Sequence, residues 1–113
     1  MFRIEIHAPT TDYDDPTIQA VFTDLDTGKV GTSTTRATEN SNGRAMVTTC
    51  ATLPYGHSWY TSTTCDPNVD GNTAGQVRAE LMQHVAQTIT LPGDPDTVLS
   101  VLHAMLCGAR ADW

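Results

Sequence analysis

The sequence predicts an α+β fold: an N-terminal β-hairpin and an antiparallel β meander of about six strands, followed by a C-terminal α-helix, in an intertwined homodimer. Three observations predict it. Apolar and polar residues alternate at the start of the chain, turn-forming residues recur between short β-branched segments, and one segment near the C-terminus has helical periodicity. Because no βαβ pattern or internal repeat interrupts this order, residues 1–113 form one predicted domain.

The expected strands are separated by recognisable turns. In the first strand Phe2, Ile4 and Ile6 alternate with polar residues. One hairpin turn is expected at 26–29, where Gly can adopt a positive φ, and another at the Asn-Gly pair of 42–43. Loops rich in Asp, Pro and Gly separate the other segments. These signals place strands at about 2–8, 18–25, 29–38, 44–53, 57–65 and 76–91.

Residues 77–91 fit two periodicities, so the pattern alone leaves their secondary structure open. Val77, Leu81 and Val85 lie four apart, as on one face of a helix, but they also share strand parity with Ile89 and Leu91. The first half is rich in helix formers, whereas the β-branched tail ends on a proline, which favours a strand. The predicted strand at 76–91 therefore depends on a family resemblance.

A helix is predicted at about 95–108. Asp94 can cap its N-terminus, Pro95 suits the first helical position, and Gly108 can end it. A single helix covers only part of one sheet face, so a monomer would expose apolar sheet surface, whereas exchange of helices in a dimer would bury it. The apolar stripe of this helix is the predicted dimer interlock: Val98, Leu99, Val101, Leu102, Met105 and Leu106.

Charge and cysteine content limit the possible partners. The net charge is −7 and only one lysine is present, so the chain as a whole is not expected to bind nucleic acid non-specifically. Three cysteines, an odd number, fit no paired disulfide framework. Neither a signal-peptide pattern nor an apolar run of about 20 residues is present, so we expect a soluble protein with no membrane association.

The sequence contains part of a calcium-binding motif. Asp66, Asn68 and Asp70 copy the start of a calcium loop, D-x-N-x-D-G, but the acidic ligand due at the twelfth position is Val77. A loop of turn-forming residues is the better account of this segment. The three residues stay a weak calcium candidate, and no other metal site is predicted.

Catalysis is not expected. Cys50, His57 and His84 are the only candidates for a Cys–His pair, and Cys107 is interpreted as a small buried side chain. No nucleophile elbow, glycine-rich phosphate loop or Cys-x-x-Cys motif accompanies them. The sequence therefore predicts a protein that is not an enzyme and that needs no cofactor.

Three features near the C-terminus occur in a distinctive order: a strand ending in Thr-aliphatic-Pro at 89–92, an Asp-containing link at 94–97 and an apolar helix at 98–106. This order resembles the C-terminal half of the coat proteins of single-stranded RNA bacteriophages, the levivirus-like family. Residues 46–51 are similar to the family's strand that receives unpaired bases, and 59–61 to the next strand. The chain ends at Trp113, which leaves no room for the family's second helix.

The resemblance implies an interlocked dimer whose long last strand is 76–91. It also implies an icosahedral shell with the helices outward and the sheet toward the RNA genome. We therefore expect a structural capsid subunit of a small RNA phage, located in the virion and assembled in the host cytoplasm, with an RNA hairpin as a further ligand. The alternative is a small phage or bacterial binding or inhibitor protein that sequesters a nucleotide or a protein partner.

Strand parity assigns residues to the RNA-facing side of the expected sheet. If Val47, Ala51 and Leu53 face the helices, alternate residues face the RNA, where hydroxyls can bond bases and guanidinium groups can contact phosphates. A solvated, threonine-rich face is the competing interpretation. The expected symmetry-axis loop holds Cys65, as a free thiol, with Asp66, Asn68 and Asp70. The expected RNA-facing residues are Arg44, Met46, Thr48, Cys50, Thr52, Trp59, Thr61, Thr63, Arg78, His84 and Thr88.

Overall fold

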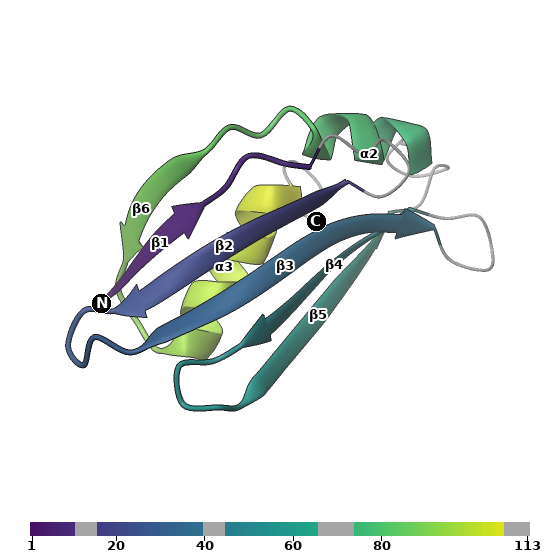
Figure 1. Ribbon diagram of the computed structural model, residues 1–113. Helices are drawn as coiled ribbons and strands as arrows, with labels where there is room; N and C mark the ends of the chain where they lie inside the picture. Colours follow the sequence, from purple (N-terminus) through teal and green to yellow (C-terminus); the bar gives the residue numbers. More distant parts are fainter. Residues whose placement is uncertain (11–15, 40–44, 66–73, 108–113) are drawn as a thin grey trace.

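A computed structural model describes residues 1–10, 16–39, 45–65 and 74–107 of the chain (Figure 1). Within these ranges the chain forms one antiparallel sheet of six strands and two α-helices. The α+β class, the antiparallel sheet and the C-terminal helix are therefore confirmed. The elements are β1 (Phe2–Ile6), β2 (Thr17–Asp24), β3 (Val30–Glu39), β4 (Ala45–Thr52), β5 (Ser58–Cys65), α2 (Ala74–Leu81), β6 (Gln87–Leu91) and α3 (Pro95–Cys107).

The order of the strands across the sheet is β5-β4-β3-β2-β1-β6. Strands β1 to β5 form an antiparallel meander. The chain then crosses to the far edge, where β6 pairs antiparallel with β1 and Ile89 lies opposite Ile4. Figure 1 shows β5 and β6 at opposite edges of the sheet. These two strands therefore carry the open edges.

The predicted long strand at 76–91 is wrong. Its first half is helix α2 and only its last five residues form a strand, β6, which pairs with β1. Val77 and Leu81, four apart, are buried on one side of α2, while Val85 is 68% exposed. The two periodicities thus belong to different halves of the segment, because the helix formers cluster before residue 82 and the β-branched residues after residue 87.

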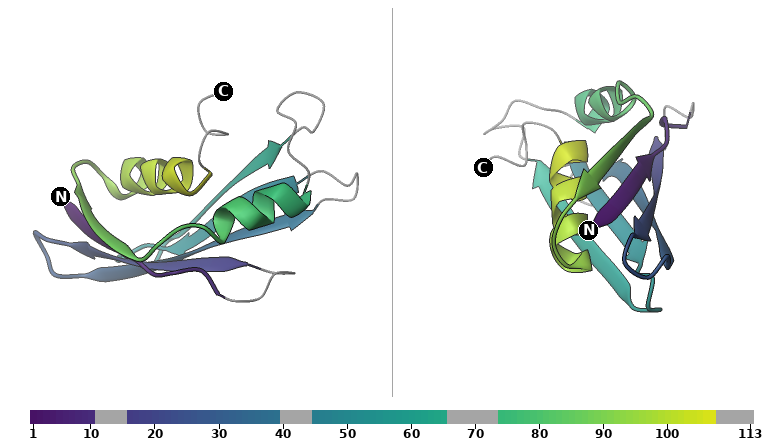
Figure 2. Two further views of the ribbon diagram at one scale, coloured as in Figure 1. Left: turned by 90° about the horizontal axis from the view of Figure 1, so that it is seen from above. Right: turned by 90° about the vertical axis from the view of Figure 1, so that its left-hand side faces the viewer.

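Both helices lie on the same side of the sheet (Figure 2). The start of α3 is capped as predicted, since the backbone N–H of Thr97 donates to Asp94 Oδ1 at 2.8 Å. This bond lowers the pKa of Asp94, because it favours the charged carboxylate. Among the described helices none is long and apolar enough to cross a bilayer.

Helix α3 packs on the sheet of its own chain. Leu99 and Leu102 are fully buried, and Val98 and Leu106 retain 1% and 4% exposure in a single copy. Burial of each such side chain contributes about 1.5–3 kcal/mol relative to exposure. The expectation that this stripe needs the sheet of a partner for cover is therefore wrong. Of the predicted interlock residues, only Val101 is exposed and only Met105 is half-buried.

The core is formed by alternate residues of the central strands. Phe2, Ile4 and Ile6 of β1 are buried, as the sequence predicts, and their partners on β2 are buried with them. The rings of Phe2 and Phe22 meet edge to face at 6.3 Å between centroids. Because side chains in a strand alternate, the residues between them form the opposite face of the sheet.

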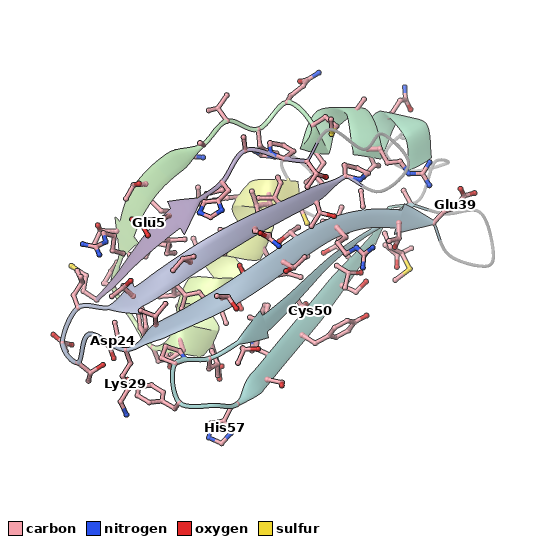
Figure 3. The ribbon with its side chains drawn as sticks, viewed as in Figure 1. Glu5, Asp24, Lys29, Glu39, Cys50 and His57 are labelled. Carbon is pink, nitrogen blue, oxygen red and sulfur yellow. The ribbon has the colours of Figure 1, made fainter. Side chains whose placement is uncertain are left out.

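Two hairpin turns contact each other at one end of the sheet (Figure 3). The Tyr55 hydroxyl donates to Asp24 Oδ2 at 2.5 Å, and Lys29 Nζ lies 5.1 Å from the centroid of the Tyr55 ring. The hydrogen bond lowers the pKa of Asp24 and raises the pKa of Tyr55, because it stabilises both the carboxylate and the protonated phenol. These contacts tie the β2–β3 turn to the β4–β5 turn.

Gly31 and Ser33 offer a paired test of the core face of β3. A Cβ at Gly31 would lie 2.5 Å from the Phe22 ring and 2.6 Å from the Thr52 carbonyl oxygen, so Gly31→Ala should cost about 1–3 kcal/mol. Ser33→Ala removes a buried hydroxyl that has no hydrogen-bond partner in the structure, so it should be neutral or stabilising by about 1 kcal/mol. Urea denaturation of both variants measures the difference. Equal midpoints would contradict this packing.

Candidate functional site

The face of the sheet opposite the helices is termed the open face. Most of the residues predicted to face RNA were expected to lie on it. Directly opposed residues of neighbouring strands share a face, and the registers Gln19↔Thr34, Thr34↔Cys50 and Cys50↔Tyr60 trace one row across it. Figure 3 looks onto this face, with Glu5 on β1 and Cys50 on β4. Its residues are Arg3, Glu5, His7, Thr17, Gln19, Val21, Thr23, Val30, Thr32, Thr34, Arg36, Thr38, Met46, Thr48, Cys50, Thr52, Ser58, Tyr60, Ser62, Thr64, Thr88 and Thr90.

The predicted orientation of β4 is confirmed. Val47 and Ala51 are buried toward the helices, and Leu53 packs against the same core. The alternate residues of β4 are half-buried or exposed on the open face, and Thr88 of β6 is exposed there as well. The members of the predicted set that lie on the open face are Met46, Thr48, Cys50, Thr52 and Thr88, and their contact with RNA stays a prediction.

The predicted orientation of β5 is wrong. Trp59, Thr61 and Thr63 lie opposite Ala51, Thr49 and Val47, and therefore on the helix-covered face. Tyr60, Ser62 and Thr64 occupy the open face instead. The turn before β5 decides this, because the Leu53 N–H donates to the His57 carbonyl and so fixes the hairpin register. A shift of one residue would reverse every side chain of the strand, and the β5 sequence alternates too weakly to indicate which face is buried.

Arg78 and His84 are also wrong as residues of the open face. Arg78 belongs to α2 and lies 3.7 Å from Glu39 at the end of β3. His84 follows α2, and its Nε2 donates to the Leu106 carbonyl near the end of α3 at 3.2 Å. Cys65 is the last residue of β5. Arg44 and the calcium and symmetry-axis candidates Asp66, Asn68 and Asp70 lie outside the described residues.

The open face differs in charge from the rest of the chain. Arg3 and Arg36 are exposed on it, and Glu5 is its one carboxylate among the described residues. The other described carboxylates lie in the β2–β3 turn, at the end of β3 next to α2, on one of the helices, or just before α3. An acidic chain with a net charge of −7 thus presents one face with a small excess of positive charge.

The open face also carries hydrogen-bonding groups and one prominent aromatic ring. Tyr60 is 64% exposed beside Cys50, at a shallow hollow of about 350 Å³ lined mainly by hydroxyl side chains. A smaller hollow of about 200 Å³ contains His7 and Gln19. Hydroxyls can bond the edges of bases, an exposed ring can stack on them, and guanidinium groups can contact phosphates.

A buried polar cluster that the sequence did not predict lies between the sheet and α3. His103 Nδ1 lies 2.7 Å from Thr49 Oγ1, and its Nε2 lies 2.8 Å from Thr63 Oγ1. Thr35 Oγ1 extends this network at 2.8 Å from Thr49 Oγ1, and Cys107 Sγ lies 3.3 Å from His103 Nε2. The four-residue spacing of His103 and Cys107 on a helix was the available signal. Cys50, His57 and His84 are not part of this cluster.

Burial controls the charge of His103. A neutral imidazole has one N–H donor and one acceptor nitrogen, so the two threonine hydroxyls can satisfy both ring nitrogens. Because burial removes water that would solvate an imidazolium, the pKa of His103 is lowered from its ordinary value. Burial therefore favours the neutral form of the imidazole.

The lowered pKa of His103 predicts loss of stability in acid. As the pH falls below about 6.5, the unfolded chain takes up a proton at this histidine before the folded chain does, so the free energy of unfolding decreases. His103→Gln should weaken this dependence. The exposed His57 provides the control, since His57→Gln should leave it unchanged. Denaturation series at several pH values measure it, and identical slopes in all three proteins would contradict the assignment.

Comparison with known proteins adds no relative. No protein-family model matches the chain, no curated protein matches it, and no solved structure matches it.

Proposed function

We propose that this chain is a structural subunit of a virus-like coat that binds single-stranded RNA on the open face of its sheet. The open face carries the proposal: it gathers hydroxyls, an exposed tyrosine and two arginines against one glutamate, while the other described carboxylates lie elsewhere. Such segregation on an acidic chain supports contact with a polyanion at this face.

The side chains of the open face suit a single strand better than a duplex. The Watson–Crick edges and the ring faces of bases are available only where bases are unpaired, and Tyr60 and the surrounding threonines offer stacking and hydrogen bonds to them. Arg3 and Arg36 on the same face would contact the phosphates that such a strand carries.

Assembly is proposed through the β5 edge of the sheet. β5 is eight residues long, SWYTSTTC, contains neither proline nor charge, and has a neighbour on one side only. A long uncharged edge of this kind is a template for pairing with another strand. Antiparallel pairing of β5 with β5 of a second copy would join two six-stranded sheets and make their open faces continuous. In this dimer each α3 stays on its own sheet, so helix exchange is not required.

A second candidate is a monomeric binding or inhibitor protein that sequesters a nucleotide or a protein partner. Full burial of Leu99 and Leu102 within one copy favours it, because the core is complete without a partner. The two candidates differ in assembly and in bound nucleic acid.

Expression of the chain alone distinguishes the candidates. The coat proposal expects uniform shells in electron micrographs, with co-purified RNA released by protein denaturation. Analytical ultracentrifugation of disassembled material should show dimers. A monomer at all concentrations, free of RNA, would overturn the coat proposal and leave the binding protein.

A further inference from the structure

We propose that the β5 edges of two copies pair in one register, in which Thr61 lies on the twofold axis and the ring of Tyr60 faces Ser62 of the partner subunit. This inference rests on the proposed assembly through the β5 edge and names the residues of the seam, the line along which the two β5 strands meet. Side chains of both copies would then form the centre of the joined open face.

The backbone groups that β5 presents at its free edge follow from the hairpin that precedes it. The Leu53 N–H donates to the His57 carbonyl at 2.7 Å, so these opposed residues form a hydrogen-bonded pair. Such pairs alternate along an antiparallel ladder, and the register of β4 with β5 is continuous over both strands. The odd-numbered residues of β5 therefore bond to β4. The residues that direct their N–H and C=O groups to the free edge are Ser58, Tyr60, Ser62 and Thr64.

A side-chain contact supports this assignment. Thr48 Oγ1 and Ser62 Oγ lie 3.3 Å apart across the β4–β5 ladder. Opposed side chains lie closest in pairs that are not joined by backbone hydrogen bonds, which is the pair type that the alternation gives for these two residues. Among the described strands none lies beyond β5, so the outward groups of Ser62 have no strand partner within one copy.

Pairing between identical edges permits few registers. Two β5 edges can meet antiparallel only about a twofold axis perpendicular to the sheet, which keeps equal faces on the same side. Opposed residues then have equal parity, so the axis passes through a residue. With the axis at Thr61, Ser58 lies opposite the partner's Thr64 and Tyr60 lies opposite the partner's Ser62, so every outward residue has a partner. If the axis moves by one residue in either direction, one outward residue of each strand faces a position outside β5.

The sizes of the side chains fit the same register. The two rings of β5, Trp59 and Tyr60, lie in its first half, and residues 61–64 are all serine or threonine. Pairing about Thr61 sets Trp59 opposite the partner's Thr63 and Tyr60 opposite the partner's Ser62, so each ring meets a small side chain. Trp59 is half-buried and Tyr60 is 64% exposed, which leaves surface on both rings for a partner to cover. The strand has no charged side chain that pairing would bury.

A cysteine scan measures the position of the axis. In Cys50→Ser/Cys65→Ser protein, one cysteine is introduced as Tyr60→Cys, Thr61→Cys or Ser62→Cys, and each protein is oxidised by air with copper phenanthroline. Only the residue on the axis meets its own copy directly, at a Cα separation of about 4.5 Å that a disulfide can span. The residues on either side lie diagonally, roughly 7–8 Å from their copies. Thr61→Cys should therefore form covalent dimers about tenfold faster than the other two variants.

Non-reducing electrophoresis measures the covalent dimer, and the background protein, which keeps the buried Cys107, is the blank. Faster crosslinking of Tyr60→Cys or Ser62→Cys would overturn the register and leave β5 as the dimer edge. Equal rates at all three positions, or no crosslinking in protein that sediments as a dimer, would also overturn it, while electron micrographs still decide the coat proposal. A chain that sediments as a monomer would overturn the register and the proposed assembly together.

Two proline variants test the direction of the backbone groups. The Ser62 N–H points to the free edge, so Ser62→Pro removes a donor to the partner and no bond to β4. The dimer dissociation constant should rise at least about 100-fold, while far-UV circular dichroism stays that of the folded chain. Thr61→Pro removes a bond to β4 and should lower the urea midpoint of the chain itself. A dimer that survives Ser62→Pro, or equal urea midpoints for the two variants, would overturn the assignment.

Discussion

Leu102→Asp is expected to unfold the chain, because it disrupts the core of a single copy. Leu102 is fully buried between α3 and the sheet, so the substitution would place an unpaired carboxylate in the core and leave space where the longer side chain was. An uncompensated buried charge costs about 3–5 kcal/mol, which is comparable to the whole stability of a small domain. Far-UV circular dichroism and urea denaturation should show an unfolded or barely folded protein.

Val101→Asp is the matched control on the same helix. Val101 is 39% exposed, so its charge can remain in water and the cost should stay near 0.5 kcal/mol, as is typical of surface changes. Urea denaturation of the two variants compares the two positions of this helix. Folded Leu102→Asp protein, or equal midpoints for the two variants, would show that Leu102 is not packed against the sheet as described.

Arg3→Glu/Arg36→Glu is expected to abolish most RNA binding while the fold stays intact. Both side chains are exposed on the open face, so reversal of their charge replaces two phosphate contacts by repulsion. The affinity for a single-stranded oligonucleotide should fall about 100-fold at low salt, close to 2.7 kcal/mol. The slope of log affinity against log salt should decrease by about 1.4, since each contact to a single strand contributes about 0.7.

Lys29→Glu is the charge-matched control for the single change Arg36→Glu. Lys29 lies at the β2–β3 turn beside Tyr55, away from the open face (Figure 3). Fluorescence anisotropy should therefore show a much larger loss for Arg36→Glu than for Lys29→Glu. Equal losses would mean that RNA responds to net charge alone, and the open face would lose its role as the RNA site. Unchanged thermal denaturation of each variant confirms that folding is not the cause.

The candidate site was predictable where local alternation is strong. On β4 the buried Val47 and Ala51 alternate with Thr48, Cys50 and Thr52, so the two-residue period predicts the correct faces. β5 reads SWYTSTTC, where serine and threonine occupy both parities, and the hairpin register alone decides that Tyr60 rather than Trp59 faces outward. His103 was not predictable as the centre of a network, because its partners Thr49 and Thr63 lie far away in the sequence.

The sequence by itself determined the α+β class, the strands of the meander, the faces of β1 and β4, and the capped apolar helix α3. These features follow from interactions within a few residues, namely side-chain alternation, turn formation and helix capping. The tertiary structure decided that 76–91 divides into α2 and β6, that β6 pairs with β1, and that α3 covers its own sheet. Local patterns show which side of a segment is apolar, but only packing against distant residues determines which surface buries it.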